Sequence, residues 1–186
     1  MESTGEFELA ILTDGRPTAE PSAATAGPAA ITVISSVEEM RNAVNRVATS
    51  AQRLMSIYTP DLEAEIYEQS EFLEILKRFV LGRNFAKVRV LLSEPARATR
   101  GSNRFVSMGR RLQSCIDIRV IHNTVAQQAA ACIIADDRAI ALRTRTDRWE
   151  GIADFNNPAI ARAHLREFDA LWLANQPPST GLLASG

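Results

Sequence analysis

Two adjacent aspartates interrupt an apolar run in the stretch AAACIIADDRAIALR, residues 129–143. Paired carboxylates at the end of a strand often belong to an active site, where they act as general acid and base. They are also frequent in turns, because aspartate tolerates turn geometry and bonds its own backbone. The apolar runs on both sides favour the second interpretation, a hairpin whose turn holds Asp136, Asp137 and Arg138.

The two histidines, His122 and His164, have neither the spacing of a metal site nor a motif that favours a triad. One alternative is a hydrolase with a rearranged site, in which His122 would act with Asp136 or Asp137. His164 borders the apolar face of the last expected helix, which is typical of a half-buried surface residue. No glycine-rich loop has the GxxxxGK[ST] or GxGxxG pattern of a phosphate-binding loop. The residues therefore predict no metal and no cofactor.

The charged residues are ordered along the chain in two blocks. Residues 61–74 contain six acidic residues and no basic one, whereas residues 77–111 contain ten basic residues and only Glu94 as an acid. Basic residues at that density can bind an anion or nucleic acid. The competing interpretation is that the two blocks pair with each other on neighbouring helices and leave no patch. The candidate anion-binding residues are Arg97, Arg100, Arg104, Arg110 and Arg111.

Length and composition are those of one globular domain with tails. The chain has 186 residues, of which 46% are hydrophobic and 23% charged. Residues 1–30 are acidic and rich in Pro, Ala, Thr and Gly, so we expect a disordered tail there and a second one at 176–186. No apolar run approaches the roughly 20 residues of a membrane helix, and the N-terminus lacks the features of a signal peptide. Cys115 and Cys132 fit buried free thiols. The expected location is cytoplasmic, with no membrane partner.

The periodicity predicts alternating strands and helices over residues 31–175. A helix should begin at Ser36, which forms a capping box with Glu39, and a last helix at Asn157 with Pro158 in its first position. Between them we expect strands at 53–60, 87–93 and 115–121, helices at 61–81 (with a break near residues 69–70) and 103–113, the hairpin, and a loop at 144–157. This order predicts an α/β fold with a mixed sheet flanked by helices, the hairpin forming its antiparallel edge.

Four segments of this pattern carry a resemblance to a known family. They are MSIYTPDLEAEIYEQSEFLEILKRFV, KVRVLLSEPARATRGSNRFVSMGRRLQSCIDIRVI, IIADDRAIALR and FDALW, within residues 36–174. Together they resemble a bacterial family of phospholipase-D-like half domains, some of whose members are attached to GNAT-type acetyltransferases. The resemblance implies a phospholipase-D-like fold in which the late hairpin carries the active-site signature.

Active members of that superfamily carry the signature H-x-K-x-x-x-x-D, with a histidine nucleophile and a lysine that holds the phosphate. With Asp136 at the aspartate position, Ala129 and Ala131 replace the histidine and the lysine. With Asp137 there, Ala130 and Cys132 replace them. The glycine–serine pair and the asparagine that follow the signature are also absent from residues 141–143. Asp136, Asp137 and Arg143 are thus the remnants at signature positions, and the covalent phosphoenzyme route is closed.

The resemblance therefore predicts a domain that is not an enzyme and acts as a binding or assembly module. The superfamily's habit of pairing half domains predicts a homodimer, and the attached acetyltransferases of relatives predict an acetyltransferase partner. The alternatives are an anion- or nucleic-acid-binding module that uses residues 77–111, and the hydrolase with a rearranged site.

Overall fold

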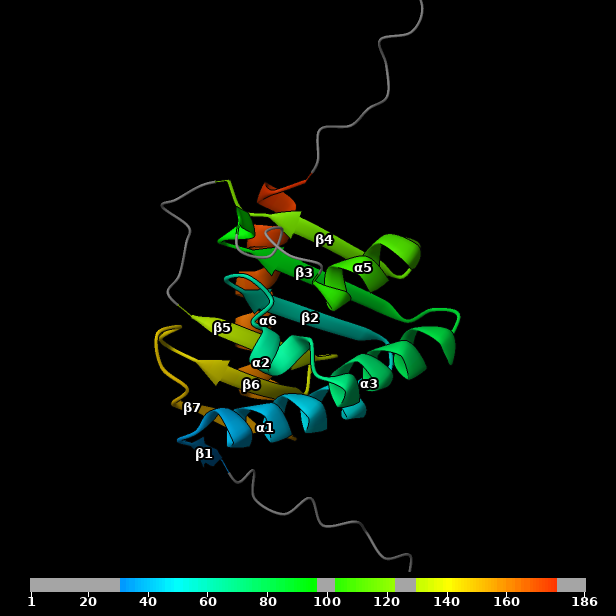
Figure 1. Cartoon of the computed structure of the whole chain (residues 1–186). Helices are drawn as coiled ribbons and strands as arrows, with labels where there is room; N and C mark the ends of the chain where they lie inside the picture. Colours follow the sequence, from blue (N-terminus) through cyan, green and yellow to red (C-terminus); the bar gives the residue numbers. More distant parts are fainter. Residues whose placement is uncertain (1–30, 97–102, 123–129, 177–186) are drawn as a thin grey trace, which may run out of the picture.

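The computed structural model describes residues 31–96, 103–122 and 130–176, and one mixed sheet runs through all three segments (Figure 1). Its strands are β1 Thr32–Ile34, β2 Leu54–Thr59, β3 Lys87–Leu92, β4 Ile116–Val120, β5 Ala131–Ala135, β6 Ala139–Arg143 and β7 Gly151–Asp154; its helices are α1 Val37–Ser50, α2 Ala64–Tyr67, α3 Ser70–Leu81, α5 Arg104–Arg111 and α6 Pro158–Ala174. The tails expected at residues 1–30 and 177–186 lie outside the described residues.

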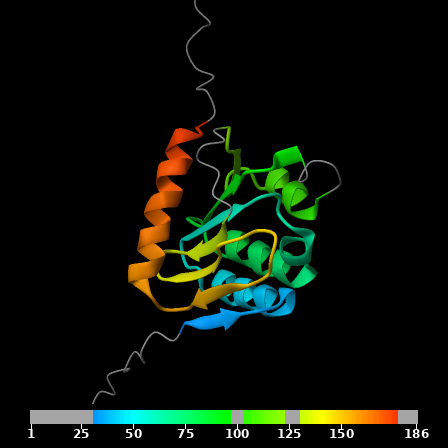
Figure 2. The same cartoon turned by 90° about the vertical axis from the view of Figure 1, so that its left-hand side faces the viewer.

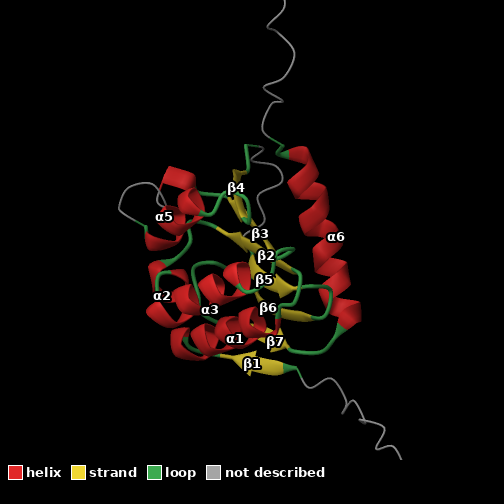
Figure 3. Ribbon diagram, turned by 90° about the vertical axis from the view of Figure 1, so that its right-hand side faces the viewer, coloured by secondary structure: helices red, strands yellow, loops and turns green. Residues whose placement is uncertain are grey.

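The strand order is β1-β7-β6-β5-β2-β3-β4. β2, β3 and β4 run parallel, and helices connect them; the other neighbouring strands are antiparallel. α1, α2, α3 and α5 cover one face of the sheet, and α6 lies by itself on the other (Figures 2 and 3). The predicted α/β class with a mixed, helix-flanked sheet is confirmed.

Residue alternation along the strands divides the core between these two faces. On the α1 side, Met55 and Ile57 pack in one large cluster with α3 residues such as Phe72. On the α6 side, Tyr58 packs with Phe168 and Trp172. The face covered by α6 carries two smaller clusters instead of one large one.

Both predicted helix starts are confirmed. The Ser36 hydroxyl accepts a hydrogen bond from the Glu39 backbone N–H at 3.2 Å, and the Glu39 carboxylate accepts one from the Ser35 N–H at 2.7 Å. The bonds from Ser35 lower the pKa of Glu39. At the start of α6 the Asn157 side chain accepts from the Ile160 N–H, and proline occupies the first turn.

The prediction that the hairpin forms the edge of the sheet is wrong, because two short strands extend the sheet beyond it. β7 lies inside the segment that was expected to be a loop and pairs with β6. β1 then pairs with β7, with Thr32 opposite Ala153. The hairpin β5–β6 is therefore an interior part of the sheet, and both of its strands are buried there.

Candidate functional site

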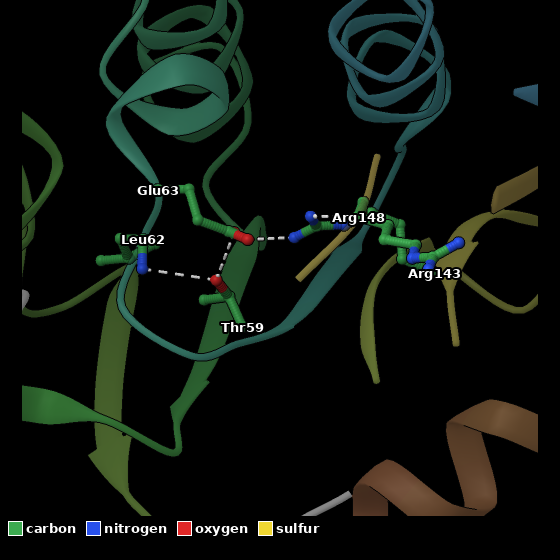
Figure 4. Close-up of polar contacts among 5 residues, drawn as sticks. All are labelled: Thr59, Leu62, Glu63, Arg143 and Arg148. Carbon is green, nitrogen blue, oxygen red and sulfur yellow. Dashed lines mark hydrogen bonds and ion pairs between the residues drawn. The ribbon is translucent and has the colours of Figure 1, made fainter. Parts of the chain in front are cut away.

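The loop that follows β2 places polar groups at the carboxyl end of the parallel strands. The Thr59 hydroxyl donates to the Glu63 carboxylate at 2.9 Å and accepts from the Leu62 N–H at 3.3 Å (Figure 4). Leu62 has a φ of 58°, a conformation that bulky residues rarely adopt. Its side chain is only 1% exposed, so burial offsets part of the backbone strain. The chain therefore bends sharply here and directs Glu63 towards the sheet.

Arg143, at the end of β6, meets Glu63 in the interior. The two side chains form an ion pair in which the arginine is 4% and the glutamate 12% exposed (Figure 4). The Arg143 guanidinium also donates to the Arg148 carbonyl at 3.2 Å and stacks over the Trp149 ring at 4.5 Å. The buried guanidinium of Arg143 therefore has partners on several sides, as a buried cation requires.

The pairing register of β5 and β6 places Ala131, a signature position, beside Arg143. Ala131 lies directly opposite Arg143 in the β5–β6 ladder. Because side chains alternate along a strand, Ala131 shares a face with Ile133, which belongs to the cluster under α1. Ala129, the position implied for the histidine, lies outside the described residues.

A cavity of about 500 Å³ opens beside this ion pair. Its walls come from the loop after β2, from α2 and from the loop before β7. The charged side chains among its lining residues are all carboxylates: Asp61, Glu63, Glu65, Glu68, Glu94 and Asp147. Two of these carboxylates are paired with arginines, Glu63 with Arg143 and Asp147 with Arg145.

The aspartate pair lies at the opposite end of the hairpin and forms its turn, as predicted. The Asp136 carboxylate accepts hydrogen bonds from three successive backbone N–H groups, those of Gln52, Arg53 and Leu54, at 2.8–2.9 Å. Asp136 has a φ of 54°, which aspartate tolerates better than most residues. This acid therefore fastens the connection between α1 and β2.

Asp137 points the other way. It forms an ion pair with Arg162 of α6 at 2.7 Å, and the hydrogen bond from Arg162 lowers the pKa of Asp137. The turn thus ties the sheet to elements on both of its faces.

The rearranged hydrolase site with His122 beside Asp136 or Asp137 is wrong on geometric grounds. His122 follows β4 at the carboxyl end of the parallel strands, where the Ile121 N–H bonds to the Leu92 carbonyl. The aspartates lie at the amino end, where the Asp136 N–H bonds to the Leu54 carbonyl. The strands separate the two groups by most of their length, far beyond hydrogen-bond reach. Asn175 accepts the bond from the backbone N–H of His122 at 3.1 Å.

Of the candidate anion-binding arginines, Arg97 and Arg100 lie outside the described residues. Arg104 donates to the Glu68 carbonyl and to the Ser70 hydroxyl, and its backbone N–H meets the Glu68 carboxylate at 3.2 Å. Arg110 and Arg111 are exposed in the last turn of α5. The acidic and basic blocks are therefore in contact through Glu68, while two arginines face solvent.

His164 lies on α6, 3.4 Å from Glu167, with 30% of its side chain exposed, as expected for a half-buried surface residue. Both cysteines are free thiols, as predicted, but their residues are half-buried where full burial was expected. Cys115 lies just before β4, not within a strand, whereas Cys132 is in β5. Burial raises the pKa of Cys132 to about 12. Within the described residues, no cluster of His, Cys, Asp and Glu could hold a metal ion, and no helix is long and apolar enough to cross a membrane.

Arg143 is one of the predicted signature positions, but no sequence pattern pointed to Glu63 as its partner. Glu63 was noticed only as one member of the acidic block, because neither residue spacing nor periodicity relates it to β6. The signal that could have found it is the charge of Arg143 itself. An arginine that ends a strongly apolar strand needs a buried acid nearby.

The fold is that of phospholipase-D-like proteins. The structure of Nuc from Salmonella typhimurium, a phospholipase D family member, matches with a TM-score of 0.56 and 20% identity over 79% of this chain and 96% of that one. NucT from Helicobacter pylori matches with a TM-score of 0.53 and 11% identity over 78% of this chain and 96% of that one.

A third similar structure is that of TrmBL2, an archaeal chromatin protein described with a novel mode of DNA binding. It matches with a TM-score of 0.60 and 11% identity over 84% of this chain, which spans 55% of that protein. The chain belongs to the family described as a domain of unknown function, DUF7931, whose model matches residues 36–180. None of the curated proteins matches the sequence.

Proposed function

We propose that this domain is a non-catalytic member of the phospholipase-D-like fold and acts as a binding or assembly module. The observation that carries the proposal is the Ala131–Arg143 pair in the hairpin. Alanine offers neither a nucleophile nor a cation at the position implied for the lysine. The nearby cation, Arg143, is neutralised by Glu63.

The role of Asp136 supports the choice of register. A carboxylate that accepts three backbone N–H bonds suits the supporting aspartate of the signature better than the exposed, α6-bound Asp137 does. That register assigns Ala129 and Ala131 to the histidine and lysine positions.

The test is hydrolysis of bis(4-nitrophenyl) phosphate and of a fluorescent single-stranded DNA by the full chain. We expect no turnover above the buffer blank. Hydrolysis that persists through successive purification steps and decreases in Asp147→Asn, an exposed residue of the acidic cavity, would contradict the proposal. Circular dichroism of the variant separates a loss of activity from a loss of fold.

The assembly part of the proposal is a homodimer with an acetyltransferase as a further partner. Both follow from the resemblance to half domains that pair and that are attached to acetyltransferases. Sedimentation of the full chain at micromolar concentrations tests the first, and a monomer would contradict it. Affinity capture from the native organism tests the second, and the absence of any acetyltransferase would contradict it.

A second candidate function is nucleic-acid binding through α5. The exposed Arg110 and Arg111 favour it, and a DNA-binding chromatin protein shares the fold. Fluorescence anisotropy with short DNA and RNA at two salt concentrations is the test. Binding should weaken steeply with salt and decrease in an Arg110→Gln, Arg111→Gln double variant, because phosphate contacts release counterions. An absence of binding at low salt would eliminate this candidate.

A further inference from the structure

The face of the sheet that α6 covers has an incomplete core. Tyr58, Phe168 and Trp172 belong to one apolar cluster and Leu142 to another. Cys132, a small residue of β5, packs against both clusters. Close packing normally leaves few voids between a helix and a sheet. Here the small side chain leaves space between the two clusters.

A cavity of about 420 Å³ fills this space, within the range of small-molecule sites. The side chains of Tyr58, Cys132, Leu142 and Phe168 contribute to its largely apolar lining. The cavity lies on the opposite face of the sheet from the Glu63–Arg143 pair. A function of this cavity would therefore not depend on whether the Glu63–Arg143 pair belongs to a catalytic site.

Among the described residues that line this cavity, the acid is Glu167 on α6, and its carboxylate lies 3.4 Å from the Nδ1 of His164. No lysine or arginine is among the described lining residues. Burial raises the pKa of the Cys132 thiol, the backbone of Tyr58 lowers it, and the negative charge of Glu167 raises it further.

We propose that the cavity under α6 binds a small amphipathic cation, with an apolar body between the two clusters and an ammonium head at Glu167. The apolar body contributes affinity by displacing water from the lining. A half-exposed ion pair strengthens binding only modestly. The ammonium head therefore contributes mainly selectivity against neutral and anionic ligands with the same apolar body.

Three probes with the same body separate these contributions: 4-phenylbutylammonium, 4-phenylbutanol and 4-phenylbutyrate. Calorimetric titration of the full chain should rank the ammonium first and the alcohol second, with a difference of about fivefold, and the carboxylate last. Equal affinities, a preference for the carboxylate, or no binding of any probe at millimolar concentrations would overturn the proposal.

Two variants locate the site. Glu167→Gln should bring the ammonium to the affinity of the alcohol and leave the alcohol unchanged. Cys132→Ile should abolish binding of all probes while it maintains or raises the melting temperature, because it fills the void with a side chain that strands favour. Glu150→Gln, an exposed acid in the loop before β7, is the matched control and should bind like the unaltered chain. Binding that survives Cys132→Ile would overturn the assignment to this cavity.

Discussion

The two ends of the β5–β6 hairpin use carboxylates in different ways. At the turn, Asp136 accepts bonds from two backbone N–H groups of the loop between α1 and β2 and from that of Leu54, the first residue of β2. At the open end, Glu63 neutralises Arg143 in the interior. The first acid satisfies peptide groups that would otherwise lack partners, and the second compensates a buried charge. The role of each acid follows from the groups that it contacts. How conspicuous the acid is in the sequence does not predict that role.

The largest effect is expected at the open end. Glu63→Gln leaves the Arg143 charge buried without its counter-ion, so the free energy of unfolding should fall by about 3–5 kcal/mol. Urea denaturation followed by circular dichroism measures it. The control is Asp147→Asn, which removes the acid of an exposed pair with Arg145. A control that shifts the midpoint as much as Glu63→Gln does would show that burial does not distinguish these pairs.

At the turn the loss should be smaller, because water can reach some of the released N–H groups. Asp136→Ala removes the acceptor of all three, and we expect a loss of about 1.5–3 kcal/mol in the free energy of unfolding. Asp136→Asn keeps one oxygen and tolerates a positive φ, so it should retain part of that stability. If the asparagine variant were less stable than the alanine variant, the backbone bonds would not be the reason for this residue.

Gly151 tests the packing around Arg143 from the side of β7. A Cβ at this position would clash with the Leu142 carbonyl oxygen and lie 3.2 Å from the Arg143 Cγ. Gly151→Ala should therefore cost about 1–3 kcal/mol in the free energy of unfolding, measured by thermal denaturation. The matched control is Gly109→Ala in α5, where the nearest atom is the movable Ile118 Cδ1 at 3.0 Å. Equal losses at both positions would argue against a tight β6–β7 contact.

The smallest expected effect is chemical and leaves stability unchanged. The raised pKa of Cys132, about 12, keeps its thiol protonated at neutral pH. Its alkylation by iodoacetamide should be slow at pH 7 and should accelerate about tenfold per pH unit up to pH 10, because the thiolate is the reactive form. Mass spectrometry with a Cys132→Ser variant separates this reaction from that of Cys115. A rate that levels off near pH 9, as for a thiol of ordinary pKa, would contradict the effect of burial.

The fold could be predicted from the sequence wherever a local signal was strong. Ser36 with Glu39, and Asn157 with Pro158, start helices through bonds within one turn, and the turn at Asp136 is equally local. The break near residues 69–70 is also present, between α2 and α3. β1 and β7 were missed because each has only three or four residues, too few for alternation to show. They are strands because each completes the other's hydrogen bonds.

The candidate site was harder to predict than the helix starts, because its contacts are not local in the sequence. Arg143 and Ala131 were named because a signature can be aligned along the chain. Glu63 and Trp149 contact Arg143 only after the sheet has formed. Sequence patterns report neighbours along one element, whereas this cluster joins residues from three separate segments.

The pairing of β1 with β7 joins two strands that are synthesised far apart in time. Thr32 is among the first described residues to leave the ribosome, but its partner, Ala153, is among the last. α1 likewise packs on β5 and β6, which are made long after it. The parallel unit of β2, α3 and β3 has its contacts close in the chain and can assemble while the rest is still being translated. The β1–β7 pair therefore forms only after residues 151–154 have been made. Until β5 and β6 join the sheet, the part of α1 that packs on them stays uncovered, and a chaperone could bind this apolar surface.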